Sequence, residues 1–393
     1  MTSYRIGRYD YSSHFLDVDD GLMPEIRSLL LEGGYILGSP VSEFESGLAA
    51  YVGARHAVGV NSGTDALILA LAALGIQRGD EVITVANTFH ATPLAIERVG
   101  ARPVLVDCRS DDYLIDLEQV EAAMTTRTKA VIVVHLFGRS VDMPAVCELA
   151  ASRSVAVIED AAQAIGATSR GSRVGALSSA GCFSFAPSKN LAAAGDAGAI
   201  TLNDQAVAEK LRLLRHFGQA EQDEHQLTGY NSRLDTIQAL VLLHKLPQLD
   251  GWTRRRVAVA KAYEEQLTDL PVAFQDPGQE GEHVYHLFQV STSERDGLLA
   301  RLRAHGVDAV VRYRHPIHLQ QAFAHFGYRP GAFPVAERLA ATTLCLPLHH
   351  AMSESTVEEI CDVVRTYLGA SHKAGRLSRA SSPVRLPDAP GAG

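Results

Sequence analysis

Val155-Ala-Val-Ile-Glu159-Asp160-Ala-Ala-Gln163 is an almost continuous apolar run that ends in two carboxylates. Such runs are typical of strands that are buried on both faces of a parallel sheet, because helices cover each side of it. Short runs of the same kind recur along the chain, at Ala57–Asn61, Glu81–Val85, Pro103–Asp107 and Ala130–His135. Helical patterns separate them, at Thr64–Leu74, Leu117–Met124 and Met143–Ser152. The alternation predicts an α/β fold with a mostly parallel sheet sandwiched by helices.

The C-terminal third of the chain has a different pattern. Two further strands are expected at Gly181–Ser184 and Ala197–Leu202, followed by two helices at Ala206–His216 and Leu234–Leu246. A long helix at Gly251–Leu267 then links them to a smaller α+β domain. We expect that domain to contain Val284–Val290, Glu294–His305, Asp308–Val311 and Ser355–Leu368. The predicted division is a large domain at 1–250, a small domain at 251–370 and a disordered tail at 371–393, which lacks a periodic apolar face.

Composition excludes several classes of protein. The net charge is -9 over 393 residues, and no basic stripe is visible, which argues against a nucleic-acid binder. No apolar run approaches the roughly 18–20 residues that a membrane span needs. The N-terminus lacks an apolar signal segment, and the five cysteines are scattered without paired spacing. We expect a soluble cytoplasmic protein with reduced thiols.

A lysine stands in an unusual setting at Phe183-Ser184-Phe185-Ala186-Pro187-Ser188-Lys189-Asn190. An apolar strand ends there in a hydroxyl, a proline and a lysine, and small residues follow that leave room for a bulky group. An exposed lysine is ordinarily a solvated surface charge. Together with Asp160 at the end of a buried strand, however, Lys189 supplies what pyridoxal 5'-phosphate (PLP) needs: an amine for a Schiff base and a carboxylate for the pyridine nitrogen.

Other candidate residues have two interpretations each. The turn at Asn61–Asp65 exposes the N–H groups of a helix start, which suits a phosphate, although capped turns of this kind are common. Asp160 could pair with a cationic ring or cap the next helix, and Gln163 could reach a ring hydroxyl. Phe89, after the second strand, could stack on a flat ring or simply pack.

Four motifs in a common register resemble the DegT/DnrJ group of sugar aminotransferases, a fold-type I, PLP-dependent family. They are Asn-Ser-Gly-Thr-Asp-Ala-Leu at 61–67, Glu-Asp-Ala-Ala-Gln at 159–163, Phe-Ser-Phe-x-Pro-Ser-Lys-Asn-Leu at 183–191 and Gly-Tyr-Asn-Ser-Arg-Leu-Asp at 229–235. The resemblance runs from about residue 15 to residue 368, in the order and spacing of the family.

The resemblance implies a role for each matching residue. Lys189 forms the Schiff base and Asp160 pairs with the pyridine nitrogen, so both are catalytic. The other cofactor contacts are implied for Gly63, Thr64 and Ser184 at the phosphate, Gln163 at the ring hydroxyl, Phe89 on the ring, and Asn231 from the neighbouring subunit of an obligate homodimer. Substrate contacts are implied for the segment 312–318 (Arg-Tyr-Arg-His-Pro-Ile-His), through Tyr313, His315 and His318. No metal is expected, because His315-x-x-His318 lacks a third ligand.

The implied reaction moves an amino group from L-glutamate or glutamine to a nucleotide-linked keto-hexose. The product is an amino sugar for the biosynthesis of an antibiotic, another natural product or a glycan. Two alternatives stay open: a keto-cyclitol (inosose) aminotransferase, and a non-catalytic regulatory protein. Ala186, Ala192 and Ala197 depart from the family pattern, and we expect them at the cavity wall, where they bear on which sugar is accepted.

Overall fold

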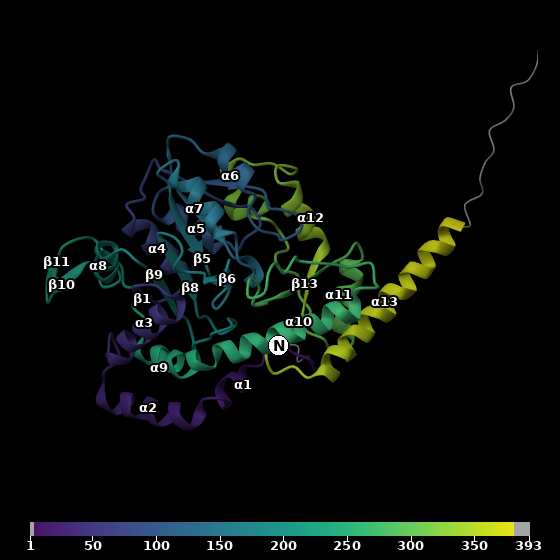
Figure 1. The fold of residues 1–393 in the computed structure, drawn as a ribbon, viewed down its shortest axis with the longest axis horizontal. Coiled ribbons are helices and arrows are strands. Elements are labelled where there is room, and N and C mark those ends of the chain that lie inside the picture. Colours follow the sequence, from purple (N-terminus) through teal and green to yellow (C-terminus); the bar gives the residue numbers. More distant parts are fainter. Residues whose placement is uncertain (1–3, 381–393) are drawn as a thin grey trace, which may run out of the picture.

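The computed structural model describes residues 4–380, with side chains over 4–369. Its centre is a seven-stranded sheet in the order β1-β9-β8-β5-β4-β2-β3 (Figure 1). The strands are β1 (His56–Val60), β2 (Glu81–Val85), β3 (Arg102–Val106), β4 (Thr128–Val134), β5 (Ala156–Asp160), β8 (Ala180–Ser184) and β9 (Gly198–Leu202). β9 runs antiparallel to both of its neighbours, and the remaining pairs are parallel. The predicted mostly parallel sheet is confirmed, with each strand within two residues of its expected bounds.

Helices cover both faces of this sheet. On one face α4 (Gly63–Ala73), α5 (Ala91–Arg98) and α8 (Gln205–Leu214) pack on alternate strand residues such as Ile158. The other face packs against α3 (Ser39–Val52), α6 (Leu117–Ala123), α7 (Met143–Ala151) and α9 (Thr236–Lys245), and includes Val157. Because successive strand side chains point to opposite faces, Asp160 lies on the face of Ile158 and Glu159 on the face of Val157.

A smaller antiparallel sheet forms the C-terminal part, in the order β12-β13-β14. Its strands are β12 (Ala273–Phe274), β13 (Phe288–Ser291) and β14 (Thr343–Leu346), and the helices against it are α10 (Leu249–Leu267), α11 (Arg295–Ala304) and α13 (Glu354–Ala380). Tyr263, Phe288 and Ile360 are among the residues of their shared apolar core. The strand expected at 308–311 is reduced to a single bridge between Val310 and Cys345.

Short elements complete the described chain. They are α1 (Tyr11–Leu16), α2 (Asp19–Glu32), β6 (Thr168–Ser169), β7 (Ser172–Arg173), β10 (Gln219–Glu221), β11 (Glu224–His225), α12 (Pro334–Thr342) and the 3-10 helices η1 (Leu136–Gly138), η2 (Leu246–Gln248), η3 (Ile317–Leu319) and η4 (Gln321–Phe326). Within residues 4–380, the helices are too short or too polar to cross a bilayer.

Two boundaries differ from the predicted division of the chain. Ile6 pairs with Val307 and joins the core of the C-terminal part, so the first residues of the predicted large domain pack with the small one. Helix α13 continues to Ala380, through the first ten residues of the predicted disordered tail. A helix that has already formed extends at little cost through residues such as alanine, lysine and arginine, even without an apolar face. Residues 381–393 of that tail lie outside the described residues.

The contact between β9 and the start of α4 predicts an effect on stability. A Cβ at Gly198 would lie 2.4 Å from the carbonyl carbon and oxygen of Ser62, which are backbone atoms that cannot turn away. We expect Gly198→Ala to lower the free energy of unfolding by about 1–3 kcal/mol, measured by denaturant titration. Gly47→Ala in α3 is the control, because its Cβ meets only Leu246 at 3.5 Å; it should be neutral or stabilising. Equal stability of the two variants would contradict this account.

Candidate active site

Most of the predicted cofactor residues surround one cavity of about 310 Å³, a size that suits a small-molecule ligand. Its walls come from the start of α4, the chain after β2, the end of β5, the end of β8 with the loop that follows, and the segment at 312–313. The structure thereby brings together most of the residues singled out in the sequence: Gly63, Thr64, Phe89, Asp160, Gln163, Ser184, Lys189 and Tyr313.

Asp160 is a buried carboxylate at the end of β5. Its Oδ2 accepts a hydrogen bond from the Thr92 hydroxyl at 2.9 Å, and its Oδ1 accepts one from the Ala162 N–H at 3.3 Å. Desolvation raises the pKa of Asp160 above its usual value, and the two hydrogen bonds and the charge of Lys189 oppose that shift. Since both hydrogen-bond donors are neutral, the carboxylate fits a further, cationic partner such as the N–H of a protonated pyridine.

Lys189 lies partly buried on the cavity wall, in the loop between β8 and β9. Phe185 anchors this loop, because its N–H donates to the Ala197 carbonyl and its carbonyl accepts from the Ala193 N–H, each at 2.8 Å. Desolvation lowers the pKa of the Lys189 ammonium to about 8; Asp160 acts to raise it and Arg312 to lower it further. A larger fraction of the amine is therefore neutral and nucleophilic near physiological pH.

The start of α4 forms an anion cradle beside Lys189. Gly63 and Thr64 belong to the first helical turn, where N–H groups have no intrahelical acceptor. A Cβ at Gly63 would come within 2.6 Å of the Ser184 Cβ, so only glycine lets Ser184 approach the helix start this closely. The Asp65 carboxylate is turned aside, where it accepts from the Ser232 hydroxyl at 2.7 Å. The cradle fits a phosphate group.

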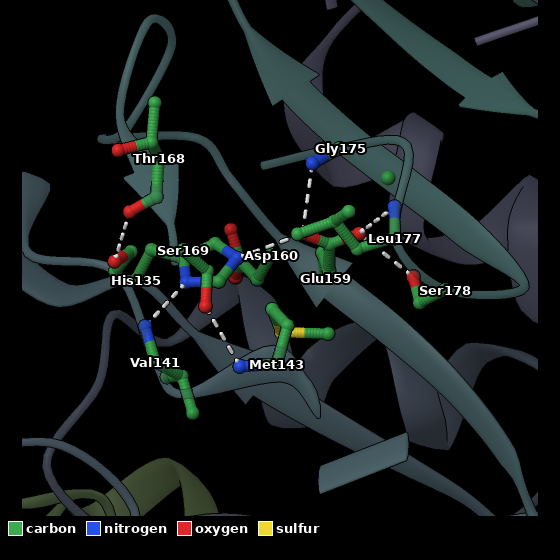
Figure 2. A network of polar contacts seen from close by, with 12 residues as sticks. His135, Val141, Met143, Glu159, Asp160, Thr168, Ser169, Gly175, Leu177 and Ser178 are labelled. Carbon is green, nitrogen blue, oxygen red and sulfur yellow. Dashed lines mark hydrogen bonds and ion pairs between the residues drawn. The ribbon is translucent and has the colours of Figure 1, made fainter. Parts of the chain in front are cut away.

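Glu159 holds the end of β5 in place from the opposite face of the sheet (Figure 2). Its oxygens accept hydrogen bonds from the Gly175 N–H at 2.8 Å, the Ser178 hydroxyl at 2.9 Å and the Leu177 N–H at 3.2 Å. The Nε2 of His135 lies 3.2 Å from Glu159 Oε2. The Val141 N–H donates to His135 Nδ1, which leaves the ring proton on Nε2, toward Glu159.

Sequence reasoning assigned no role to Glu159 or His135. The available signal was the pair of adjacent carboxylates, which must point to opposite faces of a strand. A buried glutamate with this many donors joins β4, β5 and the loop at 174–178, so that Asp160 projects from a fixed strand end. The backbone N–H of His135 also donates to the Asp160 carbonyl at 3.1 Å.

Gln163 and Phe89 both line the cavity, but Gln163 is hydrogen-bonded to the protein whereas the ring of Phe89 is exposed. The Gln163 amide is already engaged: its Oε1 accepts from the Phe137 N–H at 2.7 Å, and its Nε2 donates to the Tyr313 hydroxyl at 2.8 Å. Phe89 is 41% exposed, which is unusual for a large apolar side chain, and its ring centroid lies 5.9 Å from that of Tyr313. An exposed aromatic ring on a cavity wall offers a surface for a flat ligand.

Several predicted residues lie away from this cavity. His318 is buried in η3, with its Nε2 2.9 Å from Glu337 Oε1 and its ring edge-on to Phe333, so the structure does not bring it to the cavity wall and its substrate contact stays a prediction. His315 is exposed outside the cavity wall, as is Asn231, whose backbone bridges to His216. Across the described part of the chain, His, Cys, Asp and Glu side chains form no cluster of three that could hold a metal ion.

The alanines near Lys189 also differ from expectation. Ala186 lines the cavity, whereas Ala192 and Ala197 are buried behind it. The small side chains at 192 and 197 therefore serve packing, and only Ala186 shapes the wall. The structure adds Tyr9, His286 and Arg312 to the lining, because the N-terminal segment and the C-terminal part fold against the large sheet. Arg312 belongs to the 312–318 segment that the family resemblance placed near the substrate, whereas local sequence carried no signal for Tyr9 or His286.

Comparison with known proteins gives the relationship directly. The DegT/DnrJ/EryC1/StrS aminotransferase family matches residues 17–365. The chain is 42% identical to the erythromycin biosynthesis sensory transduction protein EryC1 of Saccharopolyspora erythraea, over 89% of this chain and 96% of that protein. It is 43% identical to the dTDP-3-amino-3,4,6-trideoxy-alpha-D-glucose transaminase of Streptomyces venezuelae, over 87% of this chain and 90% of that protein.

Solved structures agree with the sequence comparison. The crystal structure of S. venezuelae DesV in complex with a ketimine intermediate superposes with a TM-score of 0.91 at 41% identity, covering 93% of this chain and 99% of that one. The buried Asp160, the desolvated Lys189 and the anion cradle at α4 fit the ring, the aldehyde and the phosphate of the cofactor on which such enzymes depend. The chain belongs to the DegT/DnrJ/EryC1/StrS family of PLP-dependent aminotransferases.

Proposed function

We propose that the protein transfers the amino group of L-glutamate or glutamine to a nucleotide-linked keto-hexose, giving an amino sugar for antibiotic, other natural-product or glycan biosynthesis. The observation that carries the proposal is the meeting of Lys189, Asp160 and the α4 anion cradle in one cavity. The name of the S. venezuelae relative specifies a dTDP-linked 3-amino sugar, which supports carbon 3 of the hexose as the aminated position.

Lys189 has three tasks in this proposal. PLP, when bound, supplies an electron sink that stabilises negative charge on the carbon next to the amine. With PLP bound, Lys189 would hold it covalently, and the lysine amine, once free, would remove the α-proton of the donor. In the second half of the reaction the same amine returns a proton to the sugar carbon. A pKa of about 8 suits both directions near neutral pH.

Asp160 and the cradle hold the cofactor in position. The Asp160 carboxylate would accept a hydrogen bond from the protonated pyridine nitrogen and so keep the ring charged, while Gly63, Thr64 and Ser184 would bind the phosphate. Phe89, exposed on the cavity wall, would cover the ring. For Gln163 to contact the ring hydroxyl as well, its Nε2 has to share its proton donors between that oxygen and Tyr313.

We also infer a homodimer in which Asn231 reaches the cofactor phosphate of the second subunit. Asn231 is exposed and follows the β10–β11 hairpin, which projects from the body of the molecule (Figure 1). Phe217 and Tyr230 beside it are about 40% exposed. An aromatic pair of this kind on a projecting segment suits burial against another chain.

A regulatory role is the second candidate, because EryC1 is named a sensory transduction protein. A regulator that has lost catalysis has no need to keep a desolvated lysine opposite a buried aspartate, since both cost stability. The retained pair favours the enzyme.

The lowered pKa of Lys189 predicts a pH profile for cofactor capture. In the cofactor-free protein, the rate at which added PLP is captured, followed by absorbance, should rise with pH with a midpoint near 8, because only the neutral amine reacts. Lys245→Met is the control: Lys245 also has a pKa of about 8, but its Nζ donates to the Ala192 carbonyl outside the cavity. A midpoint near 10.5, or a profile that changes in the Lys245 variant, would refute the assignment.

The Asp160 carboxylate predicts opposite effects on activity and stability. Asp160→Asn should slow the half-reaction with L-glutamate by at least about 100-fold in stopped-flow assays, because an amide cannot balance the pyridinium charge. Burial raises the pKa of Asp160, so its charge opposes folding at pH 7, and this cost disappears as the pH falls below the unfolded value of 3.8. The cofactor-free variant should therefore be at least as stable as the wild type at pH 7. A less stable variant at pH 7 would show that Asp160 is structural.

The acceptor is identified by a panel of substrates. The PLP-loaded protein should first convert L-glutamate or glutamine to the 2-oxo acid, with a change in the absorbance of the cofactor. Addition of a 3-keto or 4-keto nucleotide hexose should then restore the starting absorbance. We expect the 3-keto compounds to react faster. Discharge by an inosose alone would replace the nucleotide-sugar assignment with the cyclitol one.

A further inference from the structure

Arg312 is a cation on the cavity wall that has no ion-pair partner among the residues whose side chains are described. It lines the cavity with Lys189 and Asp160, and its buried Nε has no hydrogen-bond acceptor. Over residues 4–369, no carboxylate is paired with its guanidinium within 4.0 Å. A buried donor without an acceptor is costly, so the position favours an anion that arrives with a substrate.

The backbone that carries Arg312 is fixed on both sides. The Arg312 carbonyl accepts a hydrogen bond from Gln289 Nε2 at 3.2 Å. Just before it, Val310 and Cys345 exchange backbone hydrogen bonds of 2.7 and 3.2 Å. The next residue, Tyr313, is held through its hydroxyl by Gln163. The guanidinium is thus presented to the cavity by a rigid segment, as a binding group requires.

Other arginines in the neighbourhood are already engaged. Arg8 pairs with Asp308 at 3.1 Å, and Arg256 donates to the carbonyls of Tyr285 and His286 at 3.0 and 2.8 Å. Arg314 is exposed and does not line the cavity. Among the described residues that do line it, Lys189 and Arg312 are the Lys and Arg side chains. Lys189 is committed to the cofactor, which leaves Arg312 for the substrate.

The position beside Lys189 determines which substrate anion suits Arg312. In an α-amino acid the carboxyl carbon lies about 2.5 Å from the amino nitrogen, because only two bonds separate them. The nitrogen reacts where Lys189 is attached, so the carboxylate has to lie close by. In a nucleotide-linked 3-keto hexose, four bonds separate the reacting carbon from the nearest phosphorus, which places the phosphates farther out.

We propose that Arg312 binds the α-carboxylate of the amino donor, an inference that rests on the proposed transamination. A planar guanidinium can hold a carboxylate through two parallel hydrogen bonds, and this fixes the orientation of the donor at the reacting carbon. The charge on Arg312 also contributes to the low pKa of Lys189, after desolvation. A bound carboxylate offsets that charge while the donor is in place.

The test compares L-glutamate with 4-aminobutyrate, which is glutamate without its α-carboxylate. In the holoenzyme, Arg312→Gln should lower kcat/KM for L-glutamate by about 10- to 100-fold, the range for the loss of a charge-assisted hydrogen bond. The slow reaction with 4-aminobutyrate should change less than about threefold, so the preference between the two donors collapses. Arg312→Lys should recover part of the preference, since it keeps the charge without the fork. Calorimetry with 2-oxoglutarate should show the same loss of affinity.

Arg329→Gln is the control and should behave as the wild type, because Arg329 is exposed and lies outside both the cavity wall and the 312–318 segment. An equal loss for L-glutamate and 4-aminobutyrate in Arg312→Gln would overturn the proposal, as would an unchanged preference. A rise confined to the KM of the nucleotide sugar would also overturn it and assign Arg312 to a phosphate. If the wild type transferred no amino group from any donor, the proposed function itself would have failed.

Discussion

A carboxylate that the fold has removed from water, Asp160, is the constraint on which the site depends. Its pKa is raised by burial, and its two hydrogen-bond donors are neutral. Such a group is stable in its charged form only beside a cation, and a protonated pyridine ring is a cation of suitable shape. Glu159, on the other face of the same strand, fixes the strand end because its hydrogen bonds join β4, β5 and the loop at 174–178. The two adjacent carboxylates have separate tasks because a strand alternates its faces.

The single antiparallel strand of the large sheet explains where Lys189 lies. β9 returns directly beside β8, so the loop between them stays at the edge where β5 also ends. Lys189 is in that loop and Asp160 is at that strand end, which brings the two side chains to one cavity. Two glycines make the approach possible, since side chains at Gly63 or Gly198 would collide with Ser184 or with the backbone of Ser62. The phosphate cradle, the lysine and the aspartate therefore share one compact frame.

The central strands and the Lys189–Asp160 pair were predictable from the sequence, because the patterns that indicate them are local. Apolar runs identified the central strands, and the setting of Lys189 and Asp160 identified the cofactor. What the sequence concealed depends on long-range packing. Tyr9 and His286 enter the cavity from distant segments, His318 turns inward to Glu337, and Ala192 and Ala197 are buried outside the cavity lining. Helix α13 passes the expected end of the ordered chain because helix extension needs no apolar face.

The central claim, that Lys189 is the residue joined to the cofactor, has a direct measurement. The PLP-loaded protein is reduced with borohydride, digested, and its peptides are sequenced by mass spectrometry. The account predicts a single phosphopyridoxyl group, on Lys189. A label on another lysine such as Lys245, or no label in a protein that carries the cofactor, would contradict it.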